Sequence, residues 1–457
     1  MSDLVDWLAG VLEPARVRSG DAIGEDYGHD EALTAQPHRP DVVVLPRTAA
    51  EVSAIIKLAA ELGTPVTARG SGTGLSGAAN PRGGGILVSF ELMNAILEID
   101  TANQVAVVQP GVTLDELDKA TAEHGLVYPV FPGELSASLG GNVATNAGGM
   151  RAIKYGVTRH HVLAVEAVLG TGEVIHSGGK FVKTSTGYDL TQLIVGSEGS
   201  LALVTEATLK LQPRLPHSAT LLAPFTTLEQ VTATVPKIVQ SGVGPLILEY
   251  IDQLSMAAIT HSAQLDLGVP QQVKDTSKAY LVVVLESRTT DRLDEDVAEA
   301  ATLLGELGAA DVYVLGGHAG AALIGAREKA FFTAKAAGAH DIIDMVVPRA
   351  QIADYLAAIA QAGQETGSYI LGCGHAGDGN VHMSIFQADP EKRYQALTAV
   401  FTAGLALGGA ISGEHGIGTE KKRYFLELED PAKIALMRRI KTAFDPAGVL
   451  NPGVPFD

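Results

Sequence analysis

The stretch ARGSGTGLSGAAN (68–80) carries four glycines directly after a short apolar strand. Glycine adopts backbone conformations that other residues avoid, and the N–H groups of such a chain can point together at one anionic group. The spacing matches neither the loop G-x-x-x-x-G-K-[ST] nor the fingerprint G-x-G-x-x-G that opens a helix. A flexible turn is the alternative interpretation, and this stretch alone leaves both open.

The residues up to this stretch predict a strand, a helix and a second strand within 40–70, the start of a βαβ unit. Thr48 is a candidate N-cap with Glu51 three residues later, and Gly63 ends the helix. Two more glycine-rich stretches follow, PGELSASLGGNVATNAGGMRAIKYG (132–156) and VGSEGSLALVTEATL (195–209). We read the first as a long loop, which is uncommon in a compact domain unless it has a function.

The pattern changes after the proline-containing linker QPRLPHS (212–218). Strands are predicted over 279–288 and 367–375, and helices over 292–308 and 353–367. A hairpin is predicted earlier, over 163–178, around a Gly-Thr-Gly turn. The chain is therefore expected to be an α+β protein with at least two parts.

The composition limits the classes of function. The chain has 457 residues, enough for two or three domains, and its formal net charge of -19 argues against a nucleic-acid partner. Its single cysteine, Cys373, excludes a disulfide framework. The first ten residues do not form a secretory signal, and no apolar run is long enough to span a membrane. We expect a cytoplasmic protein, or one peripheral to the inner face of a membrane.

Two histidines flank a turn in GHAGDGNVH (374–382). If 377–380 is the loop of a hairpin, His375 faces His382, and opposed side chains have Cβ atoms about 5 Å apart. Two imidazoles at that separation can reach one divalent ion. The alternative is a pair of hydrogen-bonded core histidines.

A second polar cluster, ISGEHGIGTEKKR (411–423), places Glu414 and His415 between glycines. Two histidines and one carboxylate with open positions suit Zn²⁺ or a similar divalent ion. Glu414 is thus the candidate third ligand beside His375 and His382.

In their order along the chain, the three glycine-rich stretches resemble the flavin domain of the vanillyl-alcohol oxidase/p-cresol methylhydroxylase superfamily. The resemblance implies a two-subdomain FAD-binding domain (1–215), an α+β substrate or cap domain with an antiparallel sheet (216–410), and a C-terminal segment (411–457) that returns to the flavin. Relatives with covalent FAD carry a histidine in the first loop, where this chain has Thr73. We therefore expect FAD to be bound non-covalently.

The resemblance also assigns residues to FAD. The first loop would hold the pyrophosphate, the second the isoalloxazine and ribityl, and the third the adenosine half. The expected cofactor-binding residues are Arg69, Gly70, Ser71, Gly72, Thr73, Gly74, Gly77, Pro132, Ser138, Gly141, Asn142, Thr145, Asn146, Gly148, Glu198, Gly199, Val204 and Asn451.

GHAGDGNVH, SGEHGIG and FDPAGVLNPG resemble the FAD-dependent D-2-hydroxy acid dehydrogenases, over about residues 38–453. This family includes D-lactate dehydrogenase of the cytochrome type, the flavin subunit of glycolate oxidase and D-2-hydroxyglutarate dehydrogenase. The resemblance implies a divalent metal, Zn or Mn, on His375, His382 and Glu414. It also implies a catalytic base, His415, and oxidation of a 2-hydroxy acid to the 2-keto acid.

The helical segment GAREKAFFTAKAAG (325–338) supplies Arg327, which matches the arginine that relatives place on the substrate carboxylate. A solvated helix face is the alternative. Relatives that act on dicarboxylates read LHLN where this chain has VHMS, so that Ser384 replaces an asparagine. They also carry a lysine where this chain has Ile342 and Ile343. Both differences favour a small monocarboxylate such as D-lactate or glycolate.

Other readings stay open. They are a D-2-hydroxyglutarate dehydrogenase, an oxidase that uses O₂, the ether-lipid synthase branch of the superfamily, and a non-catalytic flavin subunit of an electron-transfer complex. The intact Glu414–His415 pair argues against the last. Electrons are expected to leave to a protein or a quinone, and any iron–sulfur relay must lie on another chain, because this one has no cysteine cluster. A homodimer is one open expectation.

Overall fold

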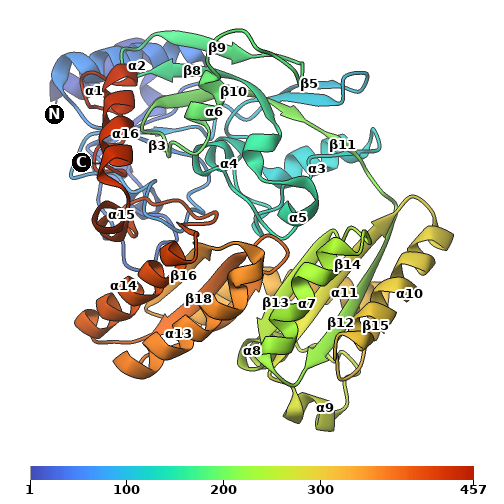
Figure 1. The fold of residues 1–457 in the computed structure, drawn as a ribbon. Helices are drawn as coiled ribbons and strands as arrows, with labels where there is room; N and C mark the ends of the chain where they lie inside the picture. Colours follow the sequence, from blue (N-terminus) through green and yellow to red (C-terminus); the bar gives the residue numbers. More distant parts are fainter. Residues whose placement is uncertain (1, 457) are drawn as a thin grey trace.

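The computed structural model describes residues 2–456 and contains two layered parts (Figure 1). The first part begins with α1 (Ser2–Val11) and a mixed four-stranded sheet. The sheet has the order β1 (Val17–Ser19), β2 (Val42–Val44), β4 (Ile86–Ser89), β3 (Val66–Arg69). Strands β2 and β3 both pair in parallel with β4, and α2 (Ala49–Leu62) connects them. The predicted βαβ start is confirmed.

Helix α2 begins and ends where the sequence predicts. The hydroxyl of Thr48 accepts a hydrogen bond from the backbone N–H of Glu51 at 3.2 Å. Gly63 ends the helix in the left-handed conformation with φ of 63°. Side chains of Val52, Ile55 and Ile56 are fully buried against the sheet. Local capping and apolar spacing together set this element.

A second, antiparallel sheet completes the first part. Its order is β5 (Ile96–Asp100), β6 (Val105–Val108), β10 (Ala202–Lys210), β8 (Val162–Leu169), β9 (Val174–Gly178). Strands β8 and β9 form the predicted hairpin. The shorter elements here are α3 (Leu114–Ala122), β7 (Leu126–Val127), α4 (Leu139–Thr145), α5 (Ala152–Tyr155) and α6 (Leu190–Ile194).

Two predictions for this region need correction. The stretch 132–156 is not a continuous loop, because it contains α4 and α5. The side chain of Ser138 caps α4, accepting the N–H of Gly141 at 3.3 Å. The predicted linker 212–218 is also partly strand, since β11 (Gln212–Pro213) pairs with β7 and β12 begins at His217.

The second part is an eight-stranded antiparallel sheet with helices on both faces (Figure 1). Its order is β15 (Tyr313–Leu315), β12 (His217–Phe225), β14 (Ala279–Ser287), β13 (Ile247–Asp252), β17 (Tyr369–His375), β18 (Asn380–Phe386), β16 (Asp341–Val346), β19 (Ala410–Ile411). One face packs against α7 (Leu228–Gln240), α10 (Thr290–Glu306), α13 (Ile352–Thr366) and α14 (Pro390–Ala406). The other packs against α8 (Gln253–Ser262) and α11 (Gly317–Glu328).

The remaining helices of this part are α9 (Gln271–Thr276) and α12 (Ala330–Ala336). The single helix expected over 325–338 is divided at Lys329, where α11 ends and α12 starts. The chain then returns to the first part through α15 (Lys422–Leu428) and α16 (Pro431–Phe444). Leu450 pairs with Val66 of β3, and Lys441 bonds to the carbonyl of Ser200.

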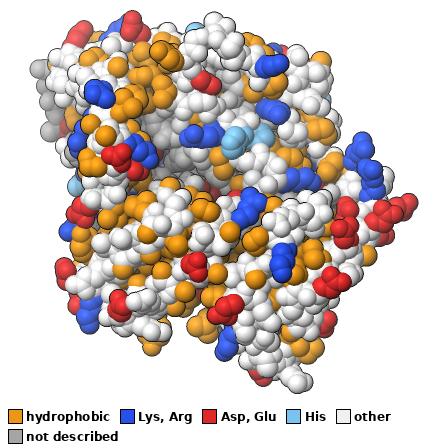
Figure 2. Space-filling view, in the orientation of Figure 1, with side chains coloured by type: hydrophobic (Ala, Val, Ile, Leu, Met, Phe, Trp, Pro, Cys, Tyr) orange, Lys and Arg blue, Asp and Glu red, His pale blue; other side chains and the backbone are white. Residues whose placement is uncertain are grey.

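The surface shown in Figure 2 carries lysine and arginine in small separate groups, interspersed with acidic side chains. None of the helices among the described residues combines the length and the hydropathy that crossing a membrane requires.

Candidate functional site

Four adjacent strands of the eight-stranded sheet place polar side chains on one face. Successive side chains of a strand point to opposite faces. In β13, Leu248 and Tyr250 belong to the core on one side, so Glu249 faces the other. The same alternation directs Asp344 of β16, His375 of β17 and His382 of β18 to that other face. The four side chains are all nearly excluded from solvent.

The two histidines meet, but not as directly opposed residues. His375 pairs with Asn380, and His382 pairs with Cys373, so the loop of the hairpin is 376–379 rather than 377–380. The predicted pairing is therefore wrong by two residues. A shift of two keeps both side chains on one face of the sheet. Their ring centroids lie 4.7 Å apart, so the predicted proximity holds.

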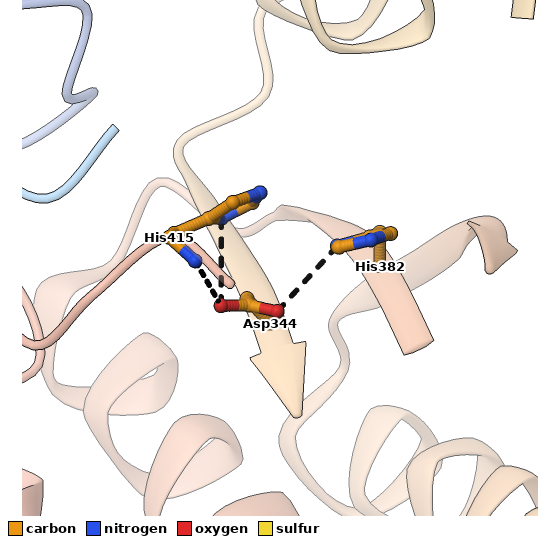
Figure 3. Close-up of side chains that lie close together, drawn as sticks. All are labelled: Asp344, His382 and His415. Carbon is orange, nitrogen blue, oxygen red and sulfur yellow. Dashed lines mark hydrogen bonds and ion pairs between the residues drawn. The ribbon is translucent and has the colours of Figure 1, made fainter. Parts of the chain in front are cut away.

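Asp344 anchors the loop that carries Glu414 and His415 (Figure 3). One of its oxygens accepts the amide of Asn380 at 2.9 Å. The other accepts the hydroxyl of Ser412 at 2.7 Å and the backbone N–H groups of Glu414 and His415 at 3.1 and 2.8 Å. This fully buried carboxylate thus folds the loop back over the sheet.

Two groups of side chains in this cluster have the composition of a metal site. They are His375, His382 and Glu414, and Asp344, His382 and His415. The second group is less suitable, because the carboxylate of Asp344 already accepts four hydrogen bonds. In the first group, Glu414 Oε1 lies 3.2 Å from Nε2 of His375 and 3.1 Å from Nε2 of His382.

The first group also has the unsatisfied nitrogen atoms that a ligand site needs. Neither ring nitrogen of His382 makes a well-aligned hydrogen bond among the described residues, although Nε2 lies 3.1 Å from Glu414. Nδ1 of His375 contacts Glu249 at 2.5 Å, which leaves Nε2 directed at Glu414. A carboxylate on the second nitrogen is the usual way to orient a metal-binding histidine. These residues fit a divalent ion.

Opposite charges hold this cluster together inside the protein. Burial would lower the pKa of His375, but Glu249 and Glu414 outweigh burial and raise it well above its usual value. Burial would raise the pKa of Glu414, but His375 and His382 outweigh burial and hold it well below its usual value. Glu249 is likewise kept ionised, because Arg327 and His375 overcome the effect of its burial on its pKa.

His415 differs from the other histidines. Its ring stacks on His382, with centroids 5.1 Å apart and planes 18° from parallel. Its Nδ1 lies 3.8 Å from Asp344. Burial lowers the pKa of His415 to about 4, which keeps the imidazole neutral near pH 7. A neutral imidazole can accept a proton.

Arg327 lies in the last turn of α11 and is nearly fully buried. One of its terminal nitrogens lies 2.8 Å from Glu249, and its Nε has no partner among the described residues. The guanidinium presents several donors in one plane, so an ion pair with Glu249 leaves others free for an anion. The solvated helix face considered from the sequence is therefore wrong for Arg327.

The glycine-rich stretches enclose a separate cavity in the first part of the chain. The side chain of Ser138 lies against the first loop, accepting the N–H of Ser71 at 3.4 Å, and a Cβ on Gly70 would clash with it. Asp30 accepts the N–H of Gly77 at 2.9 Å. Most of the expected cofactor-binding residues line this cavity: Arg69, Gly70, Ser71, Gly72, Thr73, Gly74, Pro132, Ser138, Gly141, Asn142, Thr145, Gly148, Glu198, Gly199 and Val204.

Three expected residues are not among those that line this cavity: Gly77, Asn146 and Asn451. Asn451 instead connects two loops of the cavity wall, since its amide donates to the carbonyls of Ala78 and Glu198 at 2.9 and 2.7 Å. Glu198 also accepts the backbone N–H of Gly418 at 3.0 Å. These bonds hold the C-terminal segment against the cavity.

A second cavity lies beside the first and is lined by Arg327, His375 and His382. Glu414 and His415 line both cavities. Of the two isoleucines at the position of the relatives' lysine, Ile342 lines this second cavity and Ile343 is buried in the core. Ser384 lines it as well.

The sequence alone did not identify Glu249 and Asp344 as residues of the functional site. Both lie inside apolar strands, in LILEYID (246–252) and DIIDMVV (341–347). An acidic side chain is rarely buried unless it has a partner. A single acid at a buried position of a strand is therefore the pattern that could have identified them.

Comparison with known proteins agrees with this geometry. The family described as "FAD linked oxidases, C-terminal domain" matches residues 214–454, and the "FAD binding domain" family matches residues 40–178. The chain belongs to the FAD-linked oxidases. FAD is therefore its cofactor. The matched FAD-binding domain contains the first two glycine-rich stretches that line the first cavity, which we call the flavin cavity.

Individual relatives cover the whole length. An uncharacterized FAD-linked oxidoreductase of Mycobacterium tuberculosis is 59% identical over 100% of this chain and 99% of its own. A D-lactate dehydrogenase of Anaerostipes hadrus is 38% identical over 97% of this chain and 95% of its own. The fold matches p-cresol methylhydroxylase, with a TM-score of 0.81 and 17% identity over 99% of this chain and 96% of that one. The predicted α+β fold of the vanillyl-alcohol oxidase/p-cresol methylhydroxylase type is confirmed.

Proposed function

We propose that this FAD-linked oxidoreductase oxidises a D-2-hydroxy monocarboxylic acid to the 2-keto acid. The observation that carries the proposal is the position of Glu414 and His415, which line both the flavin cavity and the cavity that contains Arg327. A substrate there has the proposed base beside it and the flavin cavity next to it. The D-lactate dehydrogenase relative supports the same class of substrate.

Arg327, His415 and Asp344 would each have a separate role in the reaction. Arg327 would hold the substrate carboxylate with the donors that Glu249 leaves free. His415, neutral near pH 7, would accept the hydroxyl proton on its imidazole, a role typically worth about 10²–10⁴-fold in rate. When bound, FAD would supply the acceptor for the hydride that leaves the carbon. Asp344 would keep the His415 loop in place.

His375, His382 and Glu414 would hold a divalent ion, Zn or Mn. Such an ion would supply Lewis-acid activation of the hydroxyl and carboxylate oxygens. A measurement independent of turnover tests this: metal content of the purified protein, compared between wild type, His382→Gln and His318→Gln. His318 is exposed and outside the cluster. Loss of metal in His382→Gln alone is expected, and equal content in all three would overturn the site.

FAD would be bound without a covalent bond to the protein. Thr73 lines the flavin cavity where covalently flavinylated relatives carry a histidine, so acid precipitation should release all FAD into solution. The reduced flavin would pass its electrons to a protein or a quinone.

The direct test is anaerobic reduction of the flavin by D- and L-lactate, glycolate and D-2-hydroxyglutarate, with and without a chelator. Bleaching of the flavin by D-lactate or glycolate, slowed by the chelator, is expected. Bleaching by none of the acids would contradict the proposed function. Bleaching that a chelator leaves unchanged would contradict the ion only.

A further inference from the structure

The second cavity changes character along its length. Its inner end holds the charged groups already described. The rest is formed by α8, α12, the neighbouring strands and loops of the first part of the chain, and most of the side chains there are apolar. The apolar members on α8, α12 and the neighbouring strands include Leu254, Ala258, Ile259, Phe331, Phe332, Ile342, Leu371 and Phe386.

These residues run from the interior to the surface. Ile259 is buried, Leu371 and Phe331 are half-buried, and Phe332 and Leu254 are 42% and 65% exposed. The cavity measures about 380 Å³. Ligand cavities of drug-sized molecules are typically ~300–1,000 Å³ and mostly apolar with a few placed polar groups. The side chain of lactate is a single methyl group and would leave most of this wall without contact.

The charges on the wall exclude a second carboxylate. Arg327 is the only lysine or arginine among the described residues that line this cavity, and it lies at the inner end beside Glu249. The other residues of charged type that line this cavity outside the cluster are Glu134 and Glu328, which are acids. A dicarboxylate would bring a second negative charge to an apolar wall without a partner, which is costly.

We infer that the substrate is a 2-hydroxy acid with an apolar side chain longer than that of lactate, seated along Phe331, Phe332 and Leu371. This inference rests on the proposed function and names the substrate class for it. The acid end lies at Arg327 and His415, and the apolar chain extends towards α8 and α12. The substrate thus remains a monocarboxylate, as the sequence indicates, but not the smallest one.

Chain length gives the expected effect. Each buried methylene contributes about 0.8 kcal/mol, which corresponds to a rise in kcat/KM of about fourfold for each added methylene. The test uses the holoenzyme and measures anaerobic flavin reduction by D-lactate, D-2-hydroxybutyrate, D-2-hydroxyvalerate and D-2-hydroxyhexanoate. D-2-hydroxyglutarate is the matched control for D-2-hydroxyvalerate, because its carbon chain has the same length and ends in a carboxylate.

The outcomes are distinct. A rising series from D-lactate, with D-2-hydroxyglutarate far below D-2-hydroxyvalerate, is expected. Flavin reduction by D-lactate that falls as the chain grows would overturn the inference and leave the proposed function standing. Reduction by none of these acids would overturn both.

Two variants test whether the apolar chain of the substrate contacts Phe332. Phe332→Ser should lower the ratio of kcat/KM for D-2-hydroxyhexanoate to that for D-lactate several-fold. Phe181→Ser is the matched control, because Phe181 is 50% exposed and lies outside the cavity. An unchanged ratio in Phe332→Ser, or an equal fall in both variants, would place the apolar chain elsewhere and overturn the inference.

Discussion

The flavin cavity and the histidine cluster lie side by side but are held together by different forces. The flavin cavity is built by glycine-rich backbone, and its buried carboxylates accept mainly N–H groups, as Asp30 does from Gly77. The cluster is built by side chains, and its carboxylates Glu249 and Glu414 face histidine or arginine, as Glu249 faces Arg327. We therefore expect an added side-chain atom to disturb the flavin cavity, and the loss of a charged group to disturb the histidine cluster.

The pKa values of the buried acids follow this division. Burial raises the pKa of Asp30 to about 6 and also raises that of Glu198, because backbone dipoles compensate only in part. For Asp344, burial acts in the same direction, but His415 and His382 outweigh it and lower the pKa below its usual value. Basic side chains, and not backbone hydrogen bonds alone, keep the pKa of this buried carboxylate low.

The largest effect is expected for His415→Asn. The amide cannot accept the hydroxyl proton, so the rate of flavin reduction should fall by about 10³-fold. FAD content should stay at the wild-type level, since the glycine-rich loops form the FAD cavity. His318→Asn, at an exposed position, is the control. A wild-type rate in His415→Asn would show that another group takes the proton.

Asp344→Asn should cost about 3–5 kcal/mol of stability, because it removes the negative charge that faces the surrounding basic side chains and turns one of two hydrogen-bond-accepting oxygens into a donor. Urea unfolding measures the change, with the exposed Asp294→Asn as the control. Ser412→Ala removes one donor to the same carboxylate and should cost about 1 kcal/mol. Equal stability of Asp344→Asn and Asp294→Asn would show that the loop is anchored by other contacts.

The difference between the backbone-built flavin cavity and the side-chain cluster also explains which features the sequence could predict. Helix α2, the β8–β9 hairpin and the glycine-rich loops depend on local capping, alternation and glycine, which are visible in the order of residues. The proximity of His375 and His382 was predicted correctly although the predicted strand register was wrong, because a shift of two residues keeps both side chains on the same face of the sheet. Pairings between distant strands are not encoded locally, so the contacts of Glu249 with His375 and Arg327 could not be predicted.

The pH dependence of stability should separate the two regions. The folded pKa of Asp30, about 6, lies above its unfolded value near 3.8, so its contribution is fully present below pH 4 and is lost as the pH rises through 6. The loss is about 2–3 kcal/mol. Asp30→Asn should lack this part of the pH dependence, while the exposed Asp21→Asn should retain it. Parallel curves for wild type and Asp30→Asn between pH 4 and 7 would contradict the raised pKa.

A modest effect is expected where a single carbon atom is added beside the flavin cavity. Gly418 has φ of 50°, and a Cβ there would collide with the carbonyl of Ser76, whose backbone lines the flavin cavity. Gly418→Ala should therefore cost about 1–3 kcal/mol and lower the FAD affinity, because the loop must shift away from Glu198. Gly305→Ala is the matched control, since its Cβ would meet nothing within 4 Å. Thermal unfolding and FAD retention on gel filtration measure both. If the two alanine variants retain FAD equally, close backbone packing at Gly418 is not what closes the cavity.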